Sequence, residues 1–182
     1  NPSAAFAMLP ADHVIEDTAG FRTILNSAFE AAETQDLLVT IGIRPTEPAT
    51  GYGYIQRGEP CGQPGGRTLY NAVRFVEKPD RETAEGYVAS GDYLWNAGMF
   101  VCRPAVILKA ISSHAPDLAK GIDELDGAWT EEFSLDEAMQ SVYPTFIKIS
   151  VDFAVMEKAE NVAVLESAFD WDDVGEWPAI ER

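Results

Sequence analysis

The sequence is poor in positive charge, in cysteine and in histidine. Of its 182 residues, 13 are lysine or arginine and 30 are aspartate or glutamate, so the formal net charge is −17 at pH 7. A field of this sign repels the phosphates of DNA and RNA, and we expect no nucleic-acid partner. Two cysteines, Cys61 and Cys102, and two histidines are too few for a zinc cage.

A long apolar run is also missing. No stretch approaches the ~20 apolar residues that a membrane-spanning helix needs, and Asn1-Pro2-Ser3 shows neither the basic region nor the cleavage pattern of a signal peptide. We therefore expect no membrane span and a reducing, cytoplasmic location. The chain is 46% hydrophobic and has no repeat or linker, which predicts one globular domain over residues 1–182.

Short apolar runs alternate with amphipathic helical patterns, which is typical of an α/β fold. Strands are expected at Ala4–Leu9, Leu37–Ile43, Leu69–Val76, Tyr93–Cys102, Phe146–Ser150 and Val162–Glu166. Helices are expected at Thr18–Thr34, from the cap Asp80 to Ala89, at Pro104–Ser113, in the acidic stretch up to Ser141, and at Asp152–Glu160. A loop is expected at Glu47–Gly66, and residues 169–177 should form a loop that leads into a last helix.

Carboxylates stand at two places where a metal ion would fit. Asp12 follows the first predicted strand, and ligands of open α/β sheets collect at the carboxyl ends of strands. Asp170, Asp172 and Asp173 crowd together near the other end, where they repel one another unless a cation or solvent intervenes. Magnesium usually takes one or two carboxylates plus substrate phosphates, so Asp12 with one of the three is a candidate pair. Turn and helix-cap roles are the alternative.

Other residues could contact a ligand, and the adjacent pair Glu77 and Lys78 suits a phosphorylated sugar. Lys78, one of five lysines, follows Glu77 at a predicted strand end; its ammonium would bind a phosphate while the carboxylate accepts from hydroxyls. A surface ion pair without function is the alternative. Gly51-Tyr52-Gly53 lets a backbone approach a ligand closely, and a common turn without function is the alternative. Asn96, inside an apolar strand, needs a hydrogen-bond partner in the protein or in a ligand.

Six strings follow one another along the sequence: LPADHVI (Leu9–Ile15), TGYGYI (Thr50–Ile55), FVEKPD (Phe75–Asp80), SGDYLWNAGMF (Ser90–Phe100), VDFAVMEKAENVAVL (Val151–Leu165) and WDDVGEW (Trp171–Trp177). In this order they resemble the sugar-1-phosphate nucleotidyltransferases. PADH, WNAGMF, AVMEKA and the DVG-W ending resemble the mannose-1-phosphate guanylyltransferase branch of that family. Each is short, but together they reach across nearly the whole chain.

The resemblance implies a Rossmann-like α/β/α sandwich and nucleotidyl transfer from GTP to mannose 1-phosphate, giving GDP-mannose and pyrophosphate. Carried over by motif, Asp12 and Asp173 would bind Mg²⁺ and act in catalysis with Lys78. The implied substrate-binding residues are Gly51, Tyr52, Glu77, Lys78, Asn96, Asp152 and Lys158.

The family's glycine-rich signature, GGxGxR followed by a PK pair, does not occur in the sequence. We therefore expect an N-terminally truncated catalytic domain that is inactive alone. An unpaired sheet edge would then favour homo-oligomers. Two alternatives stay open: a non-catalytic sugar-nucleotide-binding or regulatory module, and a nucleotidyltransferase for another hexose 1-phosphate.

Overall fold

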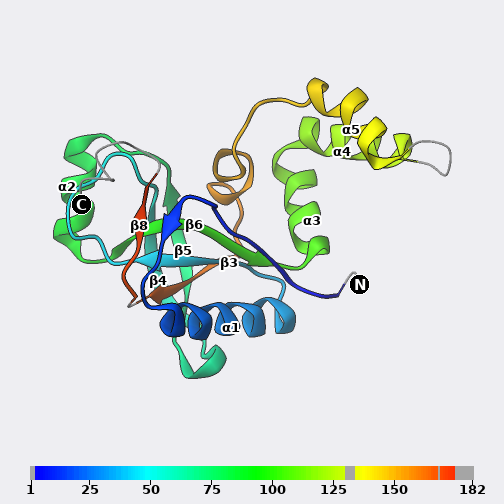
Figure 1. Ribbon diagram of the computed structural model, residues 1–182. Helices are drawn as coiled ribbons and strands as arrows, with labels where there is room; N and C mark the ends of the chain where they lie inside the picture. Colours follow the sequence, from blue (N-terminus) through cyan, green and yellow to red (C-terminus); the bar gives the residue numbers. More distant parts are fainter. Residues whose placement is uncertain (1–2, 130–133, 168, 175–182) are drawn as a thin grey trace. The chain divides into compact units, whose positions relative to one another are not determined.

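The computed structural model describes residues 3–129, 134–167 and 169–174 (Figure 1). The chain divides into two compact units, the first made of residues 1–106 and 160–182 and the second of residues 107–159. The sequence predicts a single domain because neither boundary falls in a glycine- or proline-rich linker. The boundary after Val106 lies inside a helix, and the boundary before Glu160 lies at a turn.

A six-stranded mixed sheet forms the centre of the first unit (Figure 1). Its strands, in order across the sheet, are β1 (Phe6–Met8), β6 (Tyr93–Cys102), β3 (Leu38–Ile43), β7 (Val162–Ser167), β5 (Leu69–Val76) and β4 (Tyr54–Gly62). Strands β3 and β7 run parallel, and the other pairs of this sheet run antiparallel. Because β4 also pairs with β6, the pairings β6–β3–β7–β5–β4 close into a circuit, and β1 is added on β6.

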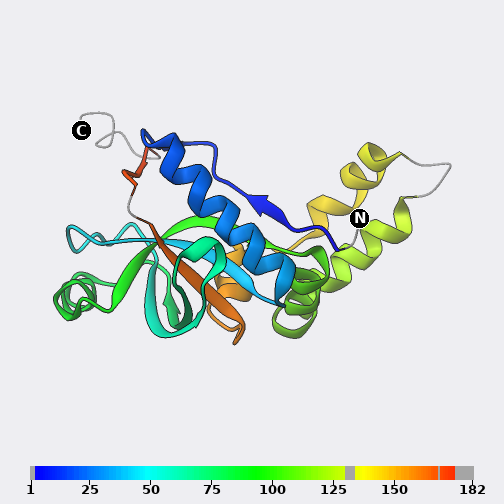
Figure 2. The same ribbon diagram turned by 90° about the horizontal axis from the view of Figure 1, so that it is seen from below.

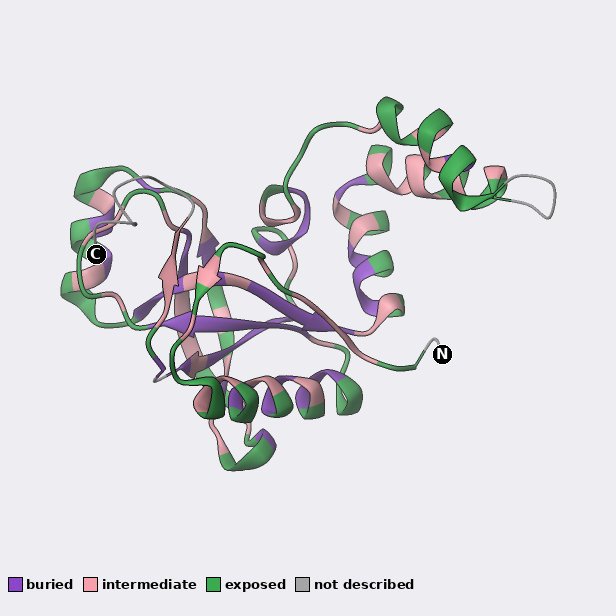
Figure 3. Cartoon of the chain, in the orientation of Figure 1, coloured by how far each residue is buried: buried purple, intermediate pink, exposed green. Residues whose placement is uncertain are grey.

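Helix α1 (Thr18–Thr34) lies along one face of this sheet (Figures 1 and 2). Asp17 caps it by accepting a hydrogen bond from the Gly20 N–H at 2.8 Å. Ile24, Ser27 and three alanines are its buried residues, and the buried part of the helix is purple in Figure 3. Alanine side chains are short, so the helix approaches the buried strand β3 closely, and this contact is part of the hydrophobic core.

Most predicted elements of the first unit are confirmed. The bounds of α1, β5 and β6 coincide with the predicted segments, and β3, β7 and α2 (Arg81–Ser90) differ by one residue at one end. The first strand is shorter than predicted, and its residues are half-buried rather than buried. Its position at the end of the strand order explains this, since an edge strand receives less cover than a central one.

The loop predicted at Glu47–Gly66 is wrong in its second half, which forms β4 and a short 3₁₀ turn, Pro64–Gly66. Gly58, Pro60 and Gly62 suggested a loop, but β4 accommodates such residues through shifts of register against β5. The sequence also predicts a loop where β8 (Asp172–Asp173) forms. The predicted last helix falls outside the described residues.

The second unit is mainly helical. It contains most of α3 (Pro104–His114), α4 (Pro116–Ala128) and α5 (Leu135–Val142). The strand predicted at Phe146–Ser150 is wrong: these residues follow a 3₁₀ turn, form no strand, and leave Ile147 and Ile149 exposed. The helix predicted at Asp152–Glu160 is reduced to a π-helical turn, Asp152–Met156. In the described part of the chain, no helix is long and apolar enough to cross a membrane.

Candidate functional site

A two-stranded ribbon joins two distant parts of the sequence. Strand β2 (His13–Val14) pairs antiparallel with β8, so that His13 lies opposite Asp173. The Val174 N–H donates to the backbone oxygen of Asp12 at 3.1 Å. The turn that follows β1 is therefore held against the aspartate-rich segment near the other end of the chain.

The ribbon brings Asp12, His13 and Asp173 together. One possible ligand atom from each of the three lies within 4.8 Å of the others. Asp12 is exposed, and His13 and Asp173 are half-buried. The proximity of the two carboxylates agrees with the sequence-based expectation; that they hold a metal ion stays a prediction.

His13 offers a hydrogen-bond donor rather than a metal ligand in this arrangement. The indole N–H of Trp171 donates to His13 Nδ1 at 3.1 Å. A neutral imidazole that accepts at Nδ1 carries its proton at Nε2. While this bond is present, neither nitrogen of the His13 ring has a lone pair that could bind a cation. The remaining candidate metal ligands are the carboxylate oxygens of Asp12 and Asp173. Two carboxylates suit magnesium, which completes its shell with water and phosphate.

An aromatic cluster of Tyr52, Trp95 and Trp171 extends from the ribbon into the sheet. Trp171 makes edge contacts with the rings of His13 and Tyr52, both at 5.2 Å between centroids. Tyr52 makes a similar contact with Trp95 at 5.1 Å. The cluster thus connects the carboxylate pair to the Gly51–Tyr54 segment and to β6.

Glu77 and Asn96 converge on Gly53. The Asn96 N–H donates to the Gly53 oxygen at 2.8 Å. A Cβ on Gly53 would lie 2.4 Å from Glu77 Oε2 and 3.3 Å from Asn96 Cβ, so a larger residue there would displace the Glu77 carboxylate from its present position. Gly51, the predicted residue, is exposed and has open space around it. The glycine that Glu77 approaches closely is the second of the pair, Gly53, and the sequence pattern does not distinguish it from Gly51.

Lys78 follows β5 in a left-handed backbone conformation, with φ of 48°. Its ammonium lies 3.6 Å from Glu77 Oε1; the lysine side chain is 63% exposed and the glutamate side chain 13%. The next helix, α2, is capped by Asp80, which accepts from the Thr83 N–H at 2.8 Å. Hydrogen bonding from Thr83 lowers the pKa of Asp80. The lysine is therefore fixed at its backbone while its charged end reaches solvent.

Asn96 stands beside an irregularity in β6. The register between β3 and β6 shifts between Thr40 and Gly42, and Gly98 adopts φ of 65°. The amide oxygen of Asn96 accepts from the Gly98 N–H and from the Thr40 hydroxyl, both at 3.1 Å. Thr40 is fully buried. For the Asn96 oxygen, the partners therefore come from the protein.

Asp152 and Lys158 lie in the second unit. Lys158 Nζ donates to the backbone oxygens of Ala154 and His114, both at 3.4 Å. Asp152 begins the π-helical turn, and its backbone oxygen accepts from the Glu157 N–H at 3.0 Å. A substrate-binding role for these two residues stays a prediction.

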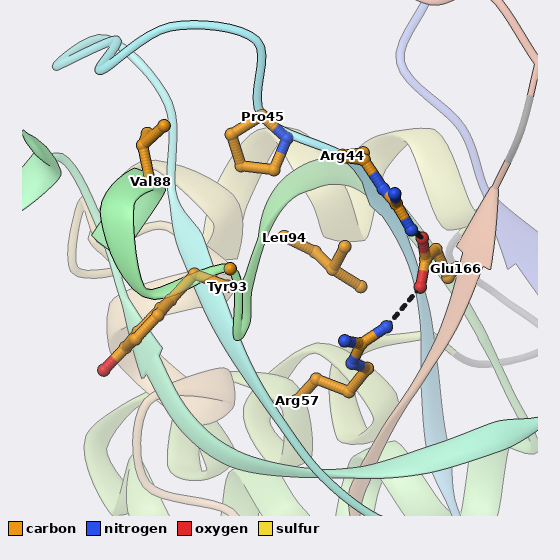
Figure 4. A pocket seen from close by; sticks show the side chains of 8 residues that line it. Arg44, Pro45, Arg57, Val88, Tyr93, Leu94 and Glu166 are labelled. Atoms are coloured by element: carbon orange, nitrogen blue, oxygen red, sulfur yellow. Dashed lines mark hydrogen bonds and ion pairs between the residues drawn. The ribbon is translucent and has the colours of Figure 1, made fainter. Parts of the chain in front are cut away.

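A cavity of about 280 Å³ in the first unit is separate from these residues (Figure 4). Glu166 forms two salt bridges there: its Oε1 lies 2.5 Å from Arg44 Nη2, and its Oε2 lies 2.5 Å from Arg57 Nη1. The three side chains tie the end of β3 to β4 and β7. The cavity is lined by Arg44, Pro45, Arg57, Val88, Gly91, Tyr93, Leu94 and Glu166, none of which was predicted as a site residue.

Sequence reasoning missed three residues of the site, His13, Trp171 and Thr40, and did not separate Gly53 from Gly51. His13, Gly53 and Trp171 stand inside the strings that carry the resemblance, so each could have been weighed beside its neighbours. Thr40 is a polar residue inside the apolar strand β3. Asn96 was chosen as a candidate for the same reason in its own strand, so the same criterion could have identified Thr40.

The sequence matches the family described as nucleotidyl transferase over residues 1–182. It is 38% identical over 173 residues to the mannose-1-phosphate guanylyltransferase of Escherichia coli strain K12. It is 39% identical over 173 residues to the xanthan biosynthesis protein XanB of Xanthomonas campestris pv. campestris strain B100. Both matches cover 95% of this chain and 36% of the relative, so the chain spans about a third of these curated proteins.

The fold is also similar to a solved structure described as mannose-1-phosphate geranyltransferase from Thermus thermophilus. The TM-score is 0.84 and the sequence identity 39%, over 98% of this chain and 49% of that one.

Proposed function

Because this chain belongs to the nucleotidyl transferase family, we propose that it serves nucleotidyl transfer from GTP to mannose 1-phosphate. The products are GDP-mannose and pyrophosphate. The observation that carries the proposal is that two groups of side chains meet the same short segment. Glu77 and Asn96 approach Gly53, and the preceding residue, Tyr52, contacts Trp171 beside the carboxylate pair Asp12–Asp173. The names of the relatives support the choice of mannose 1-phosphate and of a guanylyl donor.

Each residue has a role that its chemistry allows. Glu77 accepts hydrogen bonds from hydroxyl groups of the hexose, and Asn96 adds an amide beside it. The exposed ammonium of Lys78 meets the sugar phosphate as a point charge. Tyr52 and Trp171 cover the region between the sugar and the carboxylates and limit the access of water.

The reaction needs no nucleophile from the protein. An oxygen of mannose 1-phosphate attacks the α-phosphorus of GTP, a new P–O bond forms, and the bond to the β-phosphate oxygen breaks as pyrophosphate leaves. Asp12 and Asp173 would hold Mg²⁺, which when bound would neutralise phosphate charge. The contribution of the chain is positioning and electrostatic stabilisation.

The proposal is tested by the binding of mannose 1-phosphate to the protein and to Lys78→Ala. We expect calorimetry to show binding that the substitution weakens about 10- to 100-fold, because a charge-assisted hydrogen bond is worth about 1.5–3 kcal/mol. Binding of free mannose should change much less, since mannose carries no phosphate.

Lys109→Ala is the matched control, since it removes the same charge from an exposed position on α3. Equal losses for mannose and mannose 1-phosphate would contradict the assignment of Lys78. No binding of mannose 1-phosphate by the unchanged protein would contradict the proposed function.

A further inference from the structure

The amide oxygen of Asn96 has two donors from the protein. One is the Gly98 N–H and the other the Thr40 hydroxyl, both at 3.1 Å. A carbonyl oxygen has two lone pairs, so these two bonds use its accepting capacity. A ligand that meets Asn96 therefore meets the amide NH₂ as a donor.

The Gly98 N–H also decides which end of the amide is the oxygen. A backbone N–H can only donate, and a rotated amide would place a second donor against it. The position of Gly98 follows from the irregularity in β6, since its φ of 65° turns the backbone at this point. Bulges of this kind occur beside functional sites and redirect a side chain.

Thr40 supplies the second constraint from the neighbouring strand. It is fully buried, and its hydroxyl reaches Asn96 across the β3–β6 pairing. A hydroxyl in a buried, apolar strand costs free energy unless it is hydrogen-bonded. The amide oxygen of Asn96 accepts that bond. The orientation of the amide group is therefore held by two donors, the Gly98 N–H and the Thr40 hydroxyl.

We propose that Thr40 is a positioning residue that locks the Asn96 amide, so that Asn96 recognises an acceptor oxygen of the hexose. The assignment of the hexose as ligand rests on the proposed function. The orientation of the amide rests on the two hydrogen bonds alone. Thr40 does not act on the substrate directly and works through Asn96.

The test compares Thr40→Val with Thr40→Ser. Valine keeps the shape of threonine and removes the hydroxyl, and serine keeps the hydroxyl. In the ligand-free protein, ¹⁵N relaxation of the Asn96 side-chain amide should show increased motion in Thr40→Val and near-normal order in Thr40→Ser. The affinity for mannose 1-phosphate should fall about 2- to 10-fold in Thr40→Val, the worth of one hydrogen bond, and recover in Thr40→Ser.

Asn96→Asp tests the donor itself. The carboxylate still accepts from Gly98 and Thr40 but no longer donates, so the affinity should fall further, and the fold, followed by thermal unfolding, should persist. Undiminished binding by Asn96→Asp overturns the donor role. Unchanged amide motion in Thr40→Val, or a Thr40→Ser variant that behaves like Thr40→Val, overturns the positioning role. If the unchanged protein binds no mannose 1-phosphate, the proposed function fails, and the relaxation data still decide the role of Thr40.

Discussion

Asp12 and Asp173 are neighbours because two short backbone segments pair, although most of the chain separates them in sequence. Strand β2 pairs with β8, so that His13 lies opposite Asp173. Asp12 lies directly before β2 and accepts a backbone hydrogen bond from Val174. Two carboxylates in one place repel each other, and a bound cation relieves this repulsion. We therefore expect the first unit to bind a divalent ion at this pair.

Substitution of either aspartate should weaken metal binding. We expect Asp12→Asn and Asp173→Asn each to lower the affinity for Mn²⁺, a paramagnetic probe of magnesium sites, about 10- to 100-fold, because each removes one charged ligand. Electron paramagnetic resonance of the free ion measures the affinity. Asp170→Asn is the control, since Asp170 is exposed and lies outside the cluster. Equal effects of all three substitutions would show that only the overall charge matters.

At the residue scale, the sequence identifies the types of group but not all of their positions. Motif order alone suffices to expect that Asp12 and Asp173 meet. It does not distinguish Gly51 from Gly53, because that choice depends on the close approach of Glu77 in the folded chain. Thr40 shows its role only once β3 and β6 are paired.

At the scale of elements, the β5–α2 connection presents Lys78 between two anchored segments. β5 pairs with β4 up to Val76, and α2 begins after the cap Asp80. The left-handed conformation of Lys78 costs on the order of 1 kcal/mol and persists because both flanking elements hold the backbone.

The cap makes this connection sensitive to acid. Hydrogen bonds from Thr83 lower the pKa of Asp80, so its stabilising effect is present above the ordinary aspartate pKa of about 4 and is lost as the pH falls through the lowered value. Asp80→Asn should be less stable than the unchanged protein at pH 7, and the difference should shrink below about pH 4. Urea unfolding at several pH values measures it. A difference that is constant with pH would contradict the role of the charged cap; Asp92→Asn, at an exposed position outside a cap, is the control.

The helices and central strands were predictable because their apolar residues repeat at the period of the element. Helix α1 and strand β6 follow such patterns to their ends. β4 contains Gly58 and Pro60 and was missed, since its pairing with two strands compensates for residues that disfavour a strand. Residues 146–150 alternate like a strand, but no neighbouring strand pairs with them. Pairing partners are a property of the fold and not of the local sequence.

At the scale of the whole molecule, the resemblance to nucleotidyltransferases is confirmed. The family match over residues 1–182 and the similarity to the Thermus thermophilus structure agree with it. The α/β fold of the nucleotidyltransferase type is confirmed by the same structure and by the mixed sheet. Each motif is short, but six motifs in one fixed order along the chain were enough to identify the family.

We expect the 182-residue chain alone to form no detectable GDP-mannose. Transfer depends on donors that hold the nucleotide phosphates, and the glycine-rich signature that supplies them in the family does not occur in the sequence. Loss of one such donor costs about 10²–10³ in rate. Pyrophosphate release from GTP, magnesium and mannose 1-phosphate is the measurement.

Robust release by the purified chain would contradict this expectation and would locate a nucleotide site among these residues. A parallel titration with glucose 1-phosphate addresses the choice of hexose. Tighter binding of glucose 1-phosphate than of mannose 1-phosphate would favour a nucleotidyltransferase for another sugar.

The closed circuit of strand pairings also has a consequence for biosynthesis. β3 is paired in parallel with β7, from Leu38 opposite Val162 to Ile43 opposite Ser167. On a ribosome that adds about 5–20 residues per second, β3 waits on the order of ten seconds for this partner. Throughout that interval, the edge of β3 that pairs with β7 in the folded protein lacks this partner and is open to pairing with other nascent chains. A chaperone that shields residues 38–43 during translation should therefore raise the yield of folded protein more than one supplied after release.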